Sequence, residues 1–404
     1  MKKSTIIGIS ACVILAIVYI KYKPNYDRLT FMTTVFTGVE QYENFSRIKD
    51  IFPVTTMKAS STPYEMKEGS KISLPESFSF KGKEFNVDDF LTYTDTGALL
   101  VLHKGEVVFE RYSLSGGRDV NWLSMSVAKS FIATAIGIAV DEGLIDIQKP
   151  ITDYVPSLIG SGYENVRIKD VLQMSSGIEW REDYADPESE VIQLGRIMAV
   201  GGSMDEFIGK LKRKYEPGTV NHYVSGDTQA LGMLLTAATS TSITDYVEQK
   251  IWTPLGMETN GYWMKDDQDM EMAFAGLNAT ARDYAKLGEL YRLKGNWQGK
   301  QIVSAQWVHD AITPDAPHLQ AYVKKPYTDE SSSFGYGYQW WIPESTEGDY
   351  SAIGVYNQFI YVNPTRDIVI VKLSAFSDYS LTNEPKYFLE EETIEIFREI
   401  SKQF

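Results

Sequence analysis

The run from Phe131 to Val140 is apolar on nearly every face that a helix would present. A helix of this kind is buried in the middle of a domain rather than laid on its surface. It would stop at residues 141–143, Asp-Glu-Gly, where glycine suits the position after a helix C-terminus. With 404 residues, the chain can form one large two-part domain or two ordinary ones. The sequence therefore predicts a fold built around one central helix.

Ser126 and Lys129 stand directly before this run as a Ser-x-x-Lys pair. If Ser126 opens the helix, side chains three residues apart lie on one face. A serine hydroxyl becomes a good nucleophile when an adjacent base takes its proton, and a desolvated lysine can help to do that. The N–H groups of a helix N-terminus would lie near the same oxygen. The pattern favours a nucleophile and its base at the mouth of the central helix.

Ser-x-x-Lys alone is a weak signal, because the chain holds a second copy at Ser46 and Lys49. That copy is followed by Pro53 and has no buried helix behind it, so we interpret it as surface. For Ser126 the alternative is a helix-capping serine beside a solvated lysine. The choice depends on whether partners for the pair occur elsewhere in the chain.

A first candidate partner is Tyr223, which begins a Tyr-x-Ser triplet with Ser225. The triplet follows a Pro-Gly turn at 217–218 and precedes an apolar helix. A tyrosine can hold or relay a proton if a nearby cation lowers its pKa, and Lys129 could supply that charge. The alternative is a turn tyrosine packed on the domain surface.

A second candidate is the strand-like stretch from Ala352 to Ile360, which could close the site opposite Ser126. Gly354 would let the backbone come close to a ligand. The N–H of Val355 could then join that of Ser126 as an oxyanion hole.

At this point the chain resembles the serine β-lactamase and penicillin-binding-protein superfamily. The motifs at Ser126, Tyr223 and Gly354 occur in that superfamily's order, and the likeness covers roughly residues 85–400. It is closest to the class C-like serine hydrolases, namely the esterases and the 6-aminohexanoate-dimer hydrolases. Supporting segments are 172–177, 182–186, 217–219, 281–288 and 356–358.

The resemblance implies an α+β fold of the β-lactamase/transpeptidase type, an antiparallel β-sheet flanked by helices plus an all-helical subdomain. It also implies that Ser126 is the acylated nucleophile and that Lys129 and Tyr223 share the general-base and general-acid work. Ser225 would hydrogen-bond near them, Ser126 and Val355 would donate to the oxyanion, and Tyr184 would contact substrate. No metal or organic cofactor is implied.

One departure from the family concerns its third motif, often Lys-Thr-Gly or His-Thr-Gly, which here is Ala352-Ile-Gly354. The cation and hydroxyl that would grip a β-lactam carboxylate are missing. We therefore expect a serine hydrolase that cleaves a small ester or amide through an acyl-enzyme. The alternatives are a β-lactamase or D-Ala-D-Ala carboxypeptidase, and a catalytically silent homologue that binds peptidoglycan or a protein.

The N-terminus carries an apolar run from Thr5 to Ile20 between lysines. Sixteen helical residues span ~24 Å, slightly short of a bilayer core of ~30 Å. We expect a single transmembrane helix that holds the catalytic domain in the periplasm or outside the bacterial inner membrane. A cleaved signal peptide or a lipoprotein site at Cys12 are the alternatives.

The remaining composition excludes several classes of protein. A net charge of −15 without a basic stripe disfavours nucleic acid as a partner. One cysteine and four scattered histidines indicate neither a disulfide nor a metal site. The oligomeric state stays open.

The predicted organisation has three parts. Residues 1–23 form the anchor, 24–85 an extended arm or linker, and 86–404 the hydrolase domain. Within that domain we expect the α/β part at 86–145 and 320–404 and the helical part at 146–319. Predicted elements include a hairpin over 99–112, an amphipathic helix over 280–294 and strands over 336–342, 350–362 and 367–373, with a last helix over about 386–401.

Overall fold

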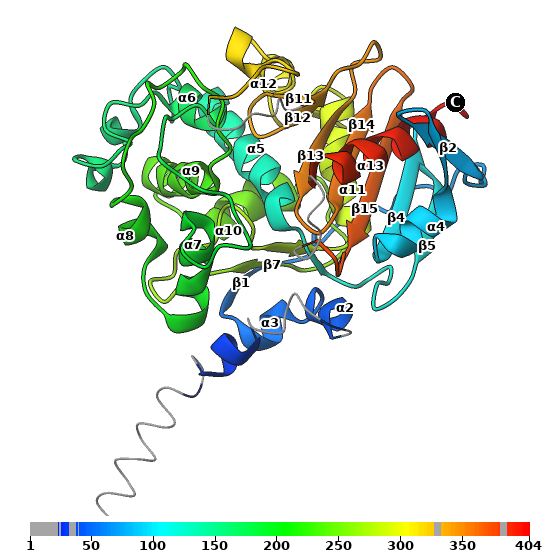
Figure 1. The fold of residues 1–404 in the computed structure, drawn as a ribbon, viewed down its shortest axis with the longest axis horizontal. Helices are drawn as coiled ribbons and strands as arrows, with labels where there is room; N and C mark the ends of the chain where they lie inside the picture. The colour runs from blue at the N-terminus through cyan, green and yellow to red at the C-terminus, as the bar shows by residue number, and fades with distance from the viewer. Residues whose placement is uncertain (1–22, 24–25, 32–37, 39, 327–332, 380–385) are drawn as a thin grey trace, which may run out of the picture.

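The computed structural model describes residues 23, 26–31, 38, 40–326, 333–379 and 386–404. Its largest sheet has seven antiparallel strands in the order β11-β12-β13-β14-β15-β4-β5. The strands come from both ends of the domain sequence, as Figure 1 shows by colour. They are β4 (Thr96–His103), β5 (Glu106–Tyr112), β11 (Phe334–Tyr336), β12 (Trp341–Pro343), β13 (Tyr350–Gly354), β14 (Gln358–Asn363) and β15 (Ile368–Ser374).

Helices cover both faces of this sheet. Alternate strand residues point to opposite faces, so Val101 and Ile370 pack toward α13 (Lys386–Ser401), while Leu100 and Val371 belong to the main core, with α11 (Ala281–Arg292). A Cβ at Gly288 would lie 2.7 Å from Val369, which shows how closely α11 approaches the sheet. The mixed α/β fold with an antiparallel sheet and flanking helices is as expected.

The helical part lies beside the sheet, with α5 (Ala128–Asp141) between the two (Figure 1). Every residue of α5 from Ala128 to Ala139 is buried, as the all-apolar pattern predicted. α5 packs on α9 (Ser225–Thr239), which is also buried over most of its length. The other helices here are α6 (Ile168–Leu172), α7 (Glu190–Val200), α8 (Met204–Ile208), α10 (Ile243–Val247) and α12 (Ala305–Ala311).

Two strand predictions were too long. The stretch 336–342 is divided between β11 and β12 by a tight turn, in which Gln339 has a φ of 61°. The Gln339 side chain is buried. Its amide is satisfied there because it accepts a hydrogen bond from Thr228 at 2.7 Å and donates one to the Leu172 carbonyl at 2.8 Å. The stretch 350–362 is likewise two strands, β13 and β14, reversed at residues 355–357.

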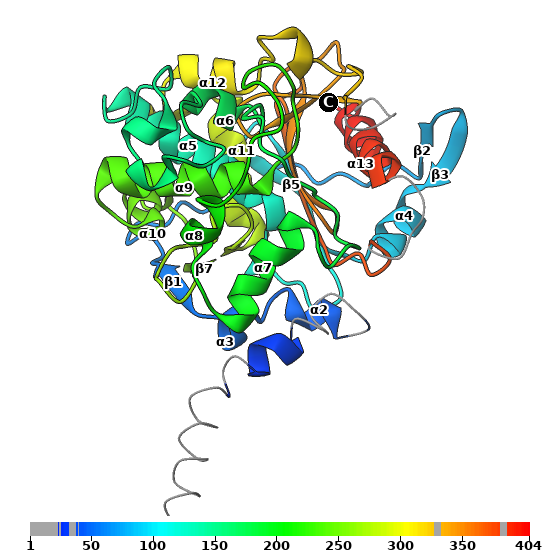
Figure 2. The ribbon, with the colours of Figure 1, turned by 60° about the vertical axis from the view of Figure 1, so that its left-hand side comes forward.

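The predicted arm or linker, residues 24–85, contains helices and strands from Gln41 onward. α2 (Gln41–Asn44), α3 (Ile48–Ile51) and β1 (Val54–Met57) pack beneath the site, and β1 joins a four-stranded sheet in the order β1-β7-β8-β6 (Figure 2). Phe45, Ile48 and Phe52 are buried there, so these apolar clusters belong to the core. The remaining elements are β2 (Ser77–Phe80), β3 (Lys83–Asn86), α4 (Val87–Tyr93), β6 (Trp122–Leu123), β7 (Gly261–Met264), β8 (Leu277–Ala279), β9 (Asn296–Trp297) and β10 (Lys300–Gln301).

The predicted membrane segment, residues 5–20, lies outside the described residues. In the part of the chain that the structure describes, no helix combines the length and apolar character needed to cross a bilayer.

Candidate active site

Ser126 sits in a single 3₁₀ turn, Met125–Val127, that leads into α5. Met125 holds a φ of 48°, a strained backbone conformation for a residue with a side chain. Lys129, on the first turn of α5, donates a hydrogen bond to the Ser126 Oγ at 2.8 Å and another to the Phe274 carbonyl at 2.9 Å. The predicted Ser-x-x-Lys pair is therefore in direct contact.

Burial changes the chemistry of the Lys129 amine. The side chain is 1% exposed, and desolvation lowers the pKa of Lys129 to about 7, while the negative charge of Glu182 opposes that shift. Near neutral pH a large fraction of the amine is therefore unprotonated. A neutral amine 2.8 Å from a hydroxyl can accept its proton.

Tyr223 lies against the same lysine, with the Lys129 Nζ 5.1 Å from its ring centroid. Its ring stacks on Trp341 with the centroids 5.2 Å apart, which fixes its orientation. Burial raises the pKa of Tyr223 well above its usual value, Glu182 raises it further, and a hydrogen bond with Ser126 opposes the shift. The sequence suggested that a charge on Lys129 could lower this pKa, but the net shift at Tyr223 is upward because burial dominates. The raised pKa keeps Tyr223 a neutral phenol near neutral pH, with a hydroxyl that can donate a hydrogen bond.

Glu182 is a site residue that we did not single out from the sequence. Its Oε1 accepts hydrogen bonds from the Ser225 hydroxyl at 2.6 Å and the Tyr184 hydroxyl at 2.7 Å. Its Oε2 accepts from the Ser225 backbone N–H at 3.2 Å. One carboxylate thus ties the pocket loop to the start of α9. The available signal was its position two residues before Tyr184 in an acidic loop, which is too common a pattern to predict a role.

Gly354 brings β13 against the Ser126 turn. A Cβ at this position would lie 2.7 Å from the Ser124 carbonyl and 3.1 Å from the Ser126 nitrogen, both backbone atoms. Only a glycine allows this approach. Val355 follows at the start of the β13–β14 turn and lines the same cavity as Ser126. The structure thus brings together the two backbone segments expected to form an oxyanion hole.

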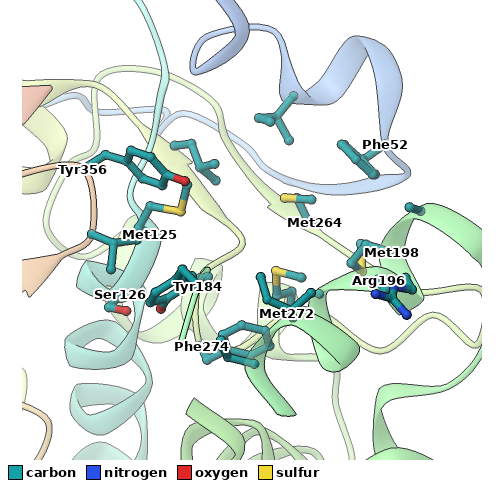
Figure 3. A pocket seen from close by; sticks show the side chains of 18 of the residues that line it. Phe52, Met125, Ser126, Tyr184, Arg196, Met198, Met264, Met272, Phe274 and Tyr356 are labelled. Atoms are coloured by element: carbon teal, nitrogen blue, oxygen red, sulfur yellow. The ribbon is translucent and has the colours of Figure 1, made fainter. Parts of the chain in front are cut away.

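A cavity of about 700 Å³ opens beside Ser126 (Figure 3). Tyr184 and Phe274 lie next to the serine hydroxyl, and Met272 and Met198 lie further in. The predicted substrate-contacting position of Tyr184 is consistent with its place in this wall.

The second Ser-x-x-Lys copy does not form a pair. The Ser46 hydroxyl donates to the Glu43 carbonyl at 2.8 Å, and the exposed Lys49 contacts Tyr262 instead. The same spacing gives contact at Ser126 because a buried helix follows there.

Comparisons with known proteins agree with this architecture. The sequence model of the Beta-lactamase family matches residues 92–383. The 6-aminohexanoate-dimer hydrolase of Paenarthrobacter ureafaciens is 31% identical over 300 residues, covering 72% of this chain and 76% of that protein. A β-lactamase from Yersinia enterocolitica is 20% identical over 215 residues, covering 47% of this chain and 53% of that protein.

Solved structures show the same fold. A Bacillus anthracis protein described as a 6-aminohexanoate-dimer hydrolase superposes with a TM-score of 0.81 at 24% identity, covering 92% of this chain and 96% of that chain. EstCE1, a hydrolase with promiscuous acyltransferase activity, gives 0.61 at 15% identity, covering 78% and 98%. Fold and sequence together define a serine hydrolase. The chain belongs to the Beta-lactamase family.

Proposed function

We propose that this protein hydrolyses a carboxylic ester or an amide through an acyl-enzyme on Ser126. The observation that carries the proposal is the 2.8 Å contact between the Lys129 Nζ and the Ser126 Oγ, at a buried amine whose pKa is about 7. A neutral amine in hydrogen-bond contact with the nucleophile meets both the geometric and the pKa requirement of a general base.

In the proposed reaction the Ser126 Oγ attacks the substrate carbonyl carbon and its proton passes to Lys129. The carbonyl oxygen becomes an oxyanion that accepts hydrogen bonds from the backbone N–H groups of Ser126 and Val355. Tyr223 relays a proton to the leaving alcohol or amine, whose bond to the carbonyl carbon breaks. Water then attacks the acyl-enzyme, releases the carboxylic acid and restores the serine.

Glu182 has a positioning role in this account. Its bonds to Ser225 and Tyr184 hold the pocket loop against the start of α9. Its charge also raises the pKa of Lys129 against the effect of burial. The order of the pocket loop and the pKa of Lys129 thus both depend on the Glu182 carboxylate.

Esters and amides fit the site better than β-lactams do. Ala352, on β13, is 1% exposed and stands where related enzymes often place a cation. An apolar side chain there gives a substrate carboxylate nothing to bind. The same position argues against the carboxypeptidase alternative, because its peptide substrates also end in a carboxylate.

The test compares the full-length protein with its Ser126→Ala variant on p-nitrophenyl butyrate, an anilide and a chromogenic cephalosporin. We expect ester or anilide turnover that is lost in the variant, with little cephalosporin cleavage. Rapid cephalosporin cleavage would instead favour a β-lactamase. The absence of both turnover and reaction with a fluorophosphonate would favour a silent binding protein.

We also propose that residues 5–20 anchor the enzyme to the inner membrane with the catalytic domain outside the cytoplasm. The support is the apolar run and its flanking lysines. Removing residues 1–23 should shift the protein from the membrane fraction to the supernatant with its activity retained. An unchanged distribution would refute the anchor.

A further inference from the structure

The cavity beside Ser126 is lined mainly by apolar side chains. Four methionines line it together with aromatic rings, and Figure 3 shows them around one open space. These six residues are Met125, Met198, Met264, Met272, Phe274 and Phe52. Methionine is flexible and polarisable, so such a wall adapts to a flexible apolar chain.

Among the described residues of the cavity wall, the charged ones are Arg196 and Asp378. Both are exposed, and Arg196, which Figure 3 shows beside Met198, donates a hydrogen bond to the Pro187 carbonyl at 3.1 Å. A substrate with a charged end inside the cavity would have to bury that charge among methionines, which is costly without a partner. The methionine-lined part of the cavity therefore favours an uncharged chain.

The position of the cavity relative to the catalytic groups shows which side of the scissile bond it receives. Ser126 and Val355, the proposed oxyanion donors, line the cavity, and Lys129 contacts its wall at the Phe274 carbonyl, whereas Tyr223 is not among the described lining residues. The leaving group must lie near Tyr223, the proposed general acid. The acyl part of the substrate therefore occupies the cavity.

We propose that the natural substrate carries an uncharged aliphatic acyl chain, longer than acetyl, which enters this cavity. The proposal rests on the serine hydrolase function proposed above. Pockets of a few hundred to 1,000 Å³ bury most of a drug-sized ligand, and the cavity of about 700 Å³ lies within that range. The arm residues Ile48 and Phe52 form part of its wall, so α3 takes part in acyl binding.

Gly195 on α7 offers a way to shorten the cavity. It lines the cavity, and a Cβ built on it meets no atom within 4 Å. Leucine is a better helix former than glycine, so Gly195→Leu should fold. Val200→Leu is the matched control, because Val200 is an exposed residue of the same helix outside the cavity.

The experiment measures kcat/KM of the full-length protein on p-nitrophenyl acetate, butyrate and octanoate, below the concentrations at which the esters aggregate. Burial of one methylene corresponds to about a fourfold increase in kcat/KM, so we expect kcat/KM to be at least ~100-fold higher on octanoate than on acetate. Gly195→Leu should lower the octanoate-to-acetate ratio at least ~10-fold, and Gly195→Ala by less. Val200→Leu should keep the wild-type ratio.

A matched series of ethyl, butyl and octyl acetates tests the assignment to the acyl side. We expect a weak dependence on the alcohol chain. If Ser126 turns over the acetate ester but kcat/KM does not rise with the length of the acyl chain, this inference is overturned and the proposed function stays intact. A steeper dependence on the alcohol than on the acyl chain would also overturn it. Failure of every ester to acylate Ser126 would instead refute the proposed function.

Discussion

Two buried lysine–serine contacts occur in the part of the chain that the structure describes, and they differ in their surroundings. Lys129 contacts Ser126 at 2.8 Å on the central helix, and Lys372 contacts Ser374 at 2.5 Å on strand β15. Burial lowers the pKa of both lysines, that of Lys372 well below its usual value. Ser126 is 7% exposed and lines a large cavity, whereas Ser374 is fully buried.

The difference shows that a desolvated amine beside a hydroxyl also occurs where no substrate could reach it, so the contact alone does not identify an active site. Lys372 also donates a hydrogen bond to the Asn357 side chain, in the turn that follows Val355. Asn357 in turn donates to Thr393 on α13 at 3.0 Å. The second contact therefore belongs to a buried network that holds the turn after Val355, the proposed oxyanion donor. Access to a cavity separates the chemical role from the structural one.

Replacing each lysine by methionine should separate the two roles, and this is the largest effect we expect. Lys129→Met should lower ester turnover at least ~100-fold, because it removes the proposed base. Lys372→Met should lower turnover by about 10-fold or less, because Ser126 keeps its base while the turn loosens. Both rates are measured on p-nitrophenyl butyrate, and comparable losses would contradict the assigned roles.

The melting temperatures of the same variants should rank in the opposite order, with Lys372→Met destabilised more than Lys129→Met. Lys372→Met removes the amine that donates to the buried side chains of Asn357 and Ser374, at a cost of about 1–3 kcal/mol. Lys129→Met leaves acceptors beside an open cavity that water can fill, so its cost should be smaller. A lower melting temperature for Lys129→Met than for Lys372→Met would contradict this account.

Gly354→Ala tests the link between the second network and the site. The added methyl would meet the Ser124 carbonyl and the Ser126 nitrogen, so β13 and the nucleophile turn must separate. Loss of one oxyanion donor costs about 10²–10³ in rate, and we expect a fall at the lower end of that range. Ile353→Val, on the same strand with its side chain in the opposite core, is the control and should keep most activity.

The pH dependence tests the base directly. A base with a pKa of about 7 is deprotonated above that value, so kcat/KM should rise as the pH increases through about 7 and then level off. A profile that is flat between pH 5.5 and 9 would argue against Lys129 as the base.

Glu182→Gln should produce the smallest effect. Removing its charge should lower the pKa of Lys129 further, so the rising limb of the profile moves to lower pH. Activity should fall severalfold as Ser225 and Tyr184 lose a shared anionic acceptor. Glu190→Gln is the matched control, since Glu190 pairs with Arg181 away from the nucleophile. A shift of the limb to higher pH would contradict the electrostatic role.

The sequence predicted the parts of the site that depend on local spacing. Ser126 and Lys129 lie on adjacent turns at the start of a helix whose apolar pattern requires burial, so their contact could be predicted. The hairpin that became β4 and β5 was also predictable, because Lys104 and Gly105 form its turn and both have positive φ. Local patterns of this kind do not depend on distant residues.

The parts that were missed depend on tertiary contacts. The Phe274 carbonyl that accepts from Lys129 has no side-chain signature, since any residue offers a carbonyl. Ile48 and Phe52 appeared as short apolar clusters without a regular period, so their place in the cavity wall required the fold. Lys372 lies within an apolar strand, and its burial depends on Asn357 from the neighbouring strand's turn.

The most direct test of the central claim is a rapid-quench mass measurement on the full-length protein during turnover of p-nitrophenyl butyrate. The account predicts a transient mass increase of one butyryl group, located on the peptide that contains Ser126 and absent from Ser126→Ala. Turnover that persists in Ser126→Ala, or an acyl group found on another residue, would contradict it.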